Sequence, residues 1–128
     1  MSDDDAMVLT IVSIEDYTSN WDFKNAMIKK VWKYPVTTDD KFTLYLPENA
    51  EPLTVQPQNG ELCMWVLVDP DAPTNARTFR LAGTGHPIYI EEGQRLDFVG
   101  TVQGYGGALV FHIFEVVTTP PQVKSEAP

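Results

Sequence analysis

The class of fold is decided by residues 57–68, which read PQNGELCMWVLV. Asn59 and Gly60 tolerate the positive φ angles of a type I′ turn, the turn that joins two antiparallel strands. The eight residues that follow, Glu61–Val68, are apolar on both sides of the chain. That pattern is typical of a central strand covered on both faces. The sequence therefore predicts a β-hairpin in which Leu53–Gln56 pairs with Glu61–Val68.

Working outward, short apolar or alternating runs that stop at proline or glycine predict further strands. The predicted set is Ile28–Tyr34, Lys41–Leu46, Leu53–Gln56, Glu61–Val68, Arg77–Leu81, a strand end and turn at Tyr89–Gly93, Leu96–Val102 and Ala108–Val117. About eight short strands with turn signals every 8–12 residues indicate an all-β domain, a small antiparallel sandwich or barrel. Both architectures use the same strand pattern, so the sequence leaves that choice open.

Composition excludes several classes of protein. A chain of 128 residues with 43% hydrophobic residues suits one domain with a real core. No apolar run reaches the ~18 residues of a membrane span, and no basic segment precedes an apolar run as in a secretory signal. One cysteine makes no internal disulfide, and no Cys/His cluster has zinc spacing. A net charge of −9 argues against direct nucleic-acid binding.

The chain is predicted to have three parts: an acidic N-terminal arm at 1–26, the β-domain at 27–117 and an extended, proline-rich tail at 118–128. The arm holds six acids and one base, a charge of −5. Its apolar run Met7–Ile14 is rich in β-branched residues and has the composition of a strand. The predicted partner-contact residues lie in this arm: Val8, Ile11, Ile14, Trp21 and Phe23.

Two glycine-rich segments are candidate ligand loops, 83–87 (GTGHP) and 104–107 (GYGG). The first lacks the third glycine, the lysine and the following helix of a phosphate-binding loop, so a tight turn is the favoured interpretation. The second is favoured as a connection between strands. The candidate ligand-loop residues are Gly83, Gly85, His86, Gly104 and Gly106.

No catalytic set, metal site or cofactor is predicted. His112 and Cys63 each lie within a predicted strand, so structural roles are favoured over a catalytic dyad. Asp69 and Asp71 offer oxygen ligands, but the two prolines beside them favour a rigid turn over a calcium loop.

Four segments carry a resemblance to a known family: 55–60 (VQPQNG), 63–73 (CMWVLVDPDAP), 83–88 (GTGHPI) and 106–112 (GGALVFH). Over about residues 27–117 the chain resembles the small, uncharacterised proteins of tailed bacteriophages and prophages, a domain of unknown function. Their usual opening is similar to residues 28–35 (IKKVWKYP). The resemblance implies a phage origin and brings no activity or catalytic residues with it. The arm and the tail depart from the pattern.

A phage β-domain with extended arms suggests a non-enzymatic virion component, such as a capsid decoration or a head- or tail-associated protein. Its arms would add strands to the sheet edges of other phage structural proteins or of further copies of this chain. The alternative is a protein of the host cytoplasm that inhibits a host protein, or that sequesters a small ligand against host defence. No membrane partner is expected.

Overall fold

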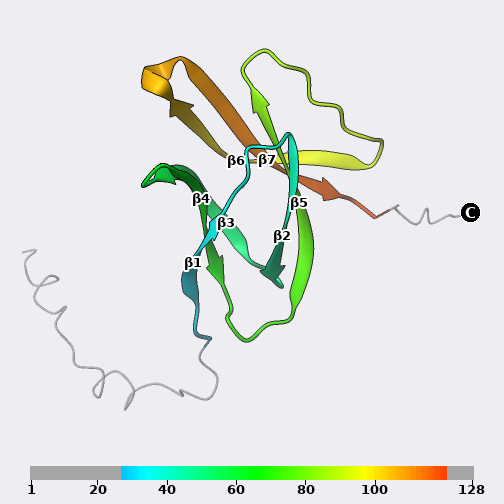
Figure 1. Ribbon diagram of the computed structural model, residues 1–128. Coiled ribbons are helices and arrows are strands. Elements are labelled where there is room, and N and C mark those ends of the chain that lie inside the picture. Colours follow the sequence, from blue (N-terminus) through cyan, green and yellow to red (C-terminus); the bar gives the residue numbers. More distant parts are fainter. Residues whose placement is uncertain (1–26, 121–128) are drawn as a thin grey trace, which may run out of the picture.

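The computed structural model describes residues 27–120, which form two antiparallel sheets (Figure 1). The strands are β1 (Lys30–Pro35), β2 (Lys41–Pro47), β3 (Glu51–Gln58), β4 (Glu61–Val68), β5 (Thr74–Gly83), β6 (Gln94–Gly104) and β7 (Leu109–Thr118). One turn of 3-10 helix, η2 (Tyr105–Gly107), joins β6 to β7. The predicted all-β class is confirmed, and the arrangement is that of a small sandwich. Within the described residues no helix has the length and apolar character needed to cross a membrane.

The first sheet has the strand order β1-β4-β3, and the second has the order β2-β5-β7-β6. The core fills the space between them, and its largest fully buried side chains come from both sheets: Leu46, Val55, Met64, Val66, Val68, Phe79 and Ile113. The rings of Phe42 and Phe79 stack with centroids 5.3 Å apart. This burial of apolar surface is the main stabilising contribution to the fold.

The two sheets approach each other closely along β3 and β6. Gly100 lies at an irregularity in β6, and a Cβ added there would stand 3.4 Å from the backbone nitrogen of Val55. A glycine at this position lets the two backbones come together. Because β3 and β6 are edge strands on this side, the other two edges, β1 and β2, lie on the opposite side.

The predicted hairpin is present. Asn59 has φ 53° and Gly60 has φ 84°, as a type I′ turn requires, and Gln58 pairs with Glu61 across it. Strand β4 has the predicted bounds and is the central strand of its sheet. Its partner β3 is longer than predicted and includes Pro52 and Pro57. An edge strand accommodates proline because one side of it needs no donor.

The prediction for Tyr89–Gly93 is wrong in part: the segment contains no strand, and the predicted turn is present at Glu92 and Gly93. Strands β5 and β6 both pair antiparallel with β7, so they run parallel to each other. Their connection, residues 84–93, must therefore cross over β7, and a segment that crosses the face of a sheet does not run along a strand edge. We call this segment the crossover loop. Its end is fixed by hydrogen bonds from the backbone N–H of Gln94 to the oxygen of Glu91 (3.0 Å) and from that of Thr119 to the oxygen of Gly93 (2.8 Å).

Candidate functional site

Strand β1 is the least covered strand of the domain. It pairs with β4 on one side, and along its other side it meets no strand in residues 27–120. Only Tyr34 among its residues is partly buried. Val31 is 52% exposed and Trp32 is 38% exposed. An open strand edge with apolar side chains on it is a template for pairing with another chain.

The residues just before β1 extend this exposed apolar surface. Met27 is 70% exposed and Ile28 is 57% exposed. We define the β1 edge surface as residues 27–33, that is, these two residues with Val31, Trp32 and the three lysines of the same stretch. No other described strand has its apolar residues exposed on successive positions in this way.

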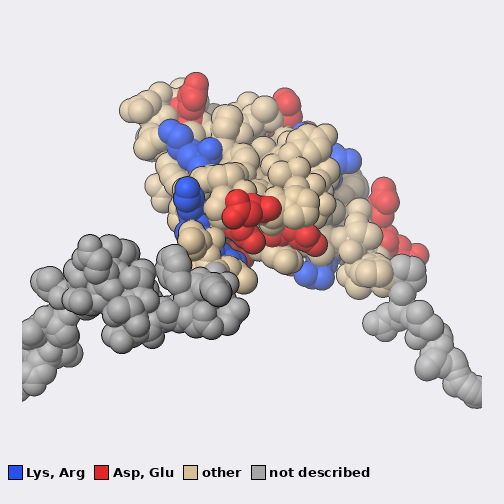
Figure 2. Space-filling model, turned by 90° about the horizontal axis from the view of Figure 1, so that it is seen from below, with Lys and Arg blue, Asp and Glu red and all other residues tan. Residues whose placement is uncertain are grey.

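The β1 edge surface is basic in an acidic protein. Residues 27–36 hold three lysines and no acid, whereas the whole chain has a net charge of −9. In Figure 2, Lys and Arg side chains gather on the left of the face, the side on which β1 runs in Figure 1. Lys33 reaches across β4 to donate to the Oε1 of Gln58 on β3 at 2.7 Å. Lys29 lines a hollow of about 320 Å³ with the acids Glu48 and Asp69, which leaves Lys30 as the lysine of this surface with neither kind of neighbour among the described residues. The surface therefore suits an extended segment that is both apolar and acidic.

Lysines on an edge strand also limit which partners it accepts. Two copies of β1 paired edge to edge would bring Lys30 and Lys33 of one copy close to those of the other. Like charges on directly opposed strand positions are destabilising. Charged residues at a strand edge are a common means of preventing such self-pairing. The surface thus favours a segment of different composition from β1 itself.

The predicted contact residues of the arm, Val8, Ile11, Ile14, Trp21 and Phe23, lie outside the described residues. The predicted ligand-loop residues lie inside them. Gly83 ends β5, and the imidazole of His86 lies against it, with Nδ1 3.3 Å from where a Cβ on Gly83 would stand. The backbone N–H of His86 donates to the oxygen of Gly83 at 3.0 Å, and Gly85 has φ 89°. This is the tight turn that the sequence indicates.

Two hollows share Gly83 and His86. One of about 220 Å³ also has Arg80 and Pro87 in its wall, and one of about 400 Å³ has Leu109 and Phe111. Only the larger volume is in the range of small-molecule sites, and that hollow combines apolar walls with one imidazole. Gly85, Gly104 and Gly106 line neither of these two hollows.

The two glycine-rich segments meet at one end of the second sheet. Gly104 pairs with Leu109 and Gly83 pairs with Phe111, on the two sides of β7. Gly106 has φ 64°, inside η2, and a Cβ added to it or to Gly104 would meet nothing within 4 Å. Gly106 therefore shapes the turn, and neither glycine is held in place by a close neighbour.

His112 and Cys63 do not form a dyad, because the side chain of each contacts other residues. His112 Nε2 is 2.7 Å from the hydroxyl of Thr84, and its Nδ1 is 3.0 Å from the hydroxyl of Thr101. Cys63 is buried, with its Sγ 3.7 Å from the oxygen of Glu61. In the loop after β4, the backbone N–H of Asp71 donates to Asp69 Oδ1 at 3.0 Å. Within residues 27–120 no three His, Cys, Asp or Glu side chains form a group that could hold a metal ion.

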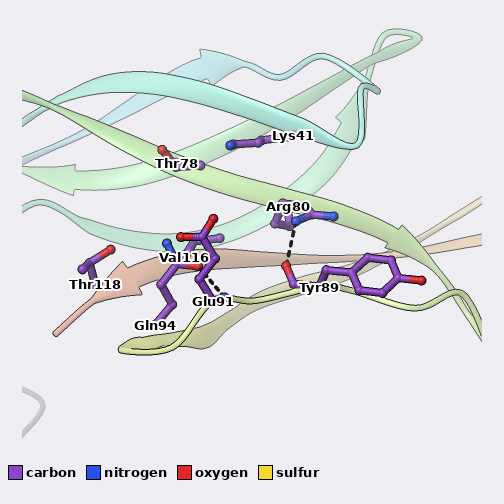
Figure 3. A pocket seen from close by; sticks show the side chains of 8 residues that line it. All are labelled: Lys41, Thr78, Arg80, Tyr89, Glu91, Gln94, Val116 and Thr118. Atoms are coloured by element: carbon purple, nitrogen blue, oxygen red, sulfur yellow. Dashed lines mark hydrogen bonds between the residues drawn. The ribbon is translucent and has the colours of Figure 1, made fainter.

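A cavity that the sequence does not reveal lies under the crossover loop (Figure 3). Its volume is about 160 Å³, and charged side chains from three segments line it, among them Lys41, Arg80 and Glu91. Arg80 fastens the loop: Nη1 donates to the oxygen of Tyr89 and Nε to that of Asp40, each at 3.2 Å. Alternation along β5 places Arg80 on the outer face, but only the path of the loop encloses the space.

Comparison with protein families identifies the domain. Residues 27–123 match the model of DUF7352, a domain of unknown function. The chain belongs to the DUF7352 family. No curated protein and no solved structure matches it. The match confirms membership of an uncharacterised domain family over the region of the predicted resemblance, and a phage origin stays a prediction.

Proposed function

We propose that this DUF7352 protein is a non-enzymatic bacteriophage protein, a structural or accessory component of the virion such as a capsid decoration or a head- or tail-associated protein. The observation that supports this role is the β1 edge surface. Its partners are other phage structural proteins or further copies of the chain. The phage origin rests on the sequence resemblance over residues 27–117.

The chemistry of the β1 edge surface favours binding to protein. Extended segments that add to a sheet edge gain main-chain hydrogen bonds, while exposed side chains such as Val31 and Trp32 provide apolar contact. A single edge contact of this kind is modest. On a particle many such contacts act together, so modest single affinities give stable attachment.

The polar side chains inside the domain support the same role because they hold its own strands together. Arg77 donates to both carboxylate oxygens of Glu115, at 2.6 and 2.8 Å, and to the backbone oxygen of Ala50 at 2.7 Å. Both ring nitrogens of His112 face threonine hydroxyls. These groups are engaged in rigidifying the scaffold, and a rigid scaffold presents a strand edge in a fixed geometry.

Quantitative mass spectrometry of gradient-purified particles tests the proposal. We expect many copies per particle, and we expect Val31→Asp to reduce incorporation at least tenfold. Leu53→Asp is the matched control, because Leu53 is 48% exposed on the other edge strand of the same sheet. Incorporation of the control at the wild-type level would assign the loss to β1. Absence of the protein from particles, together with abundance in infected cells, would overturn the proposal.

That second outcome would favour a protein of the host cytoplasm that blocks a host protein or sequesters a small ligand. The observation behind this alternative is the hollow of about 400 Å³ beside His86. Its apolar walls and single imidazole suit a small molecule with one polar group. Substitution of His86 by Ala would then weaken ligand retention, whereas the virion role predicts no effect on incorporation.

A further inference from the structure

We infer that the β1 edge surface receives the apolar run Met7–Ile14 from the arm of a second copy of this chain. The inference rests on the proposed function, because it names the partner of the same surface. Met7–Ile14 lies outside the described residues, and what it brings to the argument is its sequence. The acceptor, which is the β1 edge surface, lies within the described residues, so its exposed side chains and its charge are known.

The two segments are complementary in apolar character. The run 7–14 reads MVLTIVSI, four of whose eight residues are Val or Ile. At about 3.3 Å per residue, it would cover the whole length of β1 when extended. Added to the free edge, it would place apolar side chains beside Val31 and Trp32, which are otherwise exposed to water.

The two segments are also complementary in charge. Asp3, Asp4 and Asp5 precede the apolar run, and Glu15 and Asp16 follow it. The acceptor offers lysines and no acid over residues 27–36. A strand added there puts carboxylates at both of its ends, within reach of long lysine side chains. Opposite charges at matched positions orient such a contact and suppress wrong partners.

The chain between the two segments is long enough to reach a second copy. Residues 15–29 connect the apolar run to β1, and fifteen residues span up to about 50 Å when extended. A connection of this length can also close within one chain, and it is the proposed assembly, which holds neighbouring copies at high local concentration, that favours a second copy as the donor. Reciprocal exchange between two copies instead makes the same contact twice, as closed two-fold assemblies do.

Cysteine trapping in the full-length chain tests the inference. In a Cys63→Ala background, which removes the native thiol, one tagged chain carries Ile11→Cys and a differently tagged chain carries Val31→Cys. We expect a disulfide between the two chains at micromolar concentration. Its yield should exceed at least tenfold that obtained when the second chain carries Leu53→Cys instead, since Leu53 is comparably exposed on the far edge of the same sheet.

A charge reversal provides a second readout. Lys30→Glu with Lys33→Glu should reduce the cross-link at least fivefold, and Asp3, Asp4 and Asp5 changed to Lys should restore it. Equal yields at Val31 and Leu53 would overturn the inference, as would a cross-link found only when both cysteines are in one chain. Particles that contain the protein but show no such cross-link would leave the proposed function standing without the exchange. A cross-link in a protein that is absent from particles would support the exchange between copies and overturn the proposed function.

Discussion

The ion pair between Arg77 and Glu115 provides the sharpest test of how the domain is stabilised. Its side chains are only 20% and 12% exposed, and the pair is bidentate. Removing one partner of a fully buried pair costs about 3–5 kcal/mol, whereas an exposed pair contributes about 0–1 kcal/mol. For this partly exposed pair we expect Glu115→Gln to lower the free energy of unfolding by about 2–3 kcal/mol, roughly 10–20 °C in Tm for a domain of this size.

The assay is urea and thermal unfolding of the full chain, followed by circular dichroism. The exposed pair of Arg95 with Asp97 is the internal control, and Asp97→Asn should leave the midpoint unchanged. Replacing both partners, Arg77→Met with Glu115→Leu, should recover most of the loss. The double variant should remain about 1 kcal/mol less stable than the wild type, because the backbone oxygen of Ala50 loses its hydrogen-bond donor. A Glu115→Gln variant within 0.5 kcal/mol of wild type would refute this account, since the pair would then behave as a solvent-screened surface contact.

The pH dependence of this pair has a definite sign. The hydrogen bonds to Glu115 raise the pKa of the Arg77 guanidinium more than burial lowers it. A basic group whose pKa is higher in the folded state than in the unfolded state stabilises the fold fully at pH values below its unfolded-state pKa. This stabilisation is lost only as the pH rises through the folded-state pKa. The contribution of the guanidinium is therefore constant across neutral pH and disappears only in strong alkali.

Three further predictions concern the turn, the crossover loop and β1. Gly60→Ala should destabilise the domain by about 1–2 kcal/mol because φ is 84° there. Gly104→Ala, at a residue with φ −130°, should leave the stability unchanged or raise it slightly. Denaturant midpoints measure both effects. Arg80→Ala should speed proteolysis and amide exchange in residues 84–93, since the crossover loop loses its tie to the sheet; equal rates would contradict the fastening role. Burial raises the pKa of Tyr34 above its ordinary value of 10.0, so stability should fall as the pH rises beyond that value, and Tyr34→Phe should abolish this component of an alkaline unfolding series.

The sequence predicts the fold well wherever the decisive interactions are local. Asn59 and Gly60 specify their turn through their own backbone preferences, and the run Glu61–Val68 is apolar enough to mark a central strand. The prediction fails at Tyr89–Gly93, where the residues suit a strand end and the topology makes the segment part of a connection that crosses over β7. The presence of Pro52 and Pro57 inside β3 is likewise decided by its place at the edge of the sheet.

The candidate surface is harder to predict than the fold, because exposure depends on strand order. Val31 and Trp32 look like ordinary core residues in the sequence. They are exposed because β1 is an edge strand on the side away from the close approach of β3 and β6. The cavity at Arg80 is invisible for the same reason, since its roof is a loop that crosses another strand. Local pattern identifies strands, and long-range topology decides which of their faces stay open.

The proposed contact between copies of this acidic protein has a consequence for its dependence on salt. Chains with a net charge of −9 repel one another over about a Debye length, ~8 Å at physiological ionic strength. In the proposed exchange, the lysines of the β1 edge surface would offset this repulsion where the arm binds. Added salt should weaken both the repulsion between whole chains and the attraction at the edge, whereas it leaves the apolar burial at Val31 and Trp32 intact. Exchange should therefore depend only weakly on salt, and a steep loss of the Ile11–Val31 cross-link with added salt would mean that the lysines alone hold the arm.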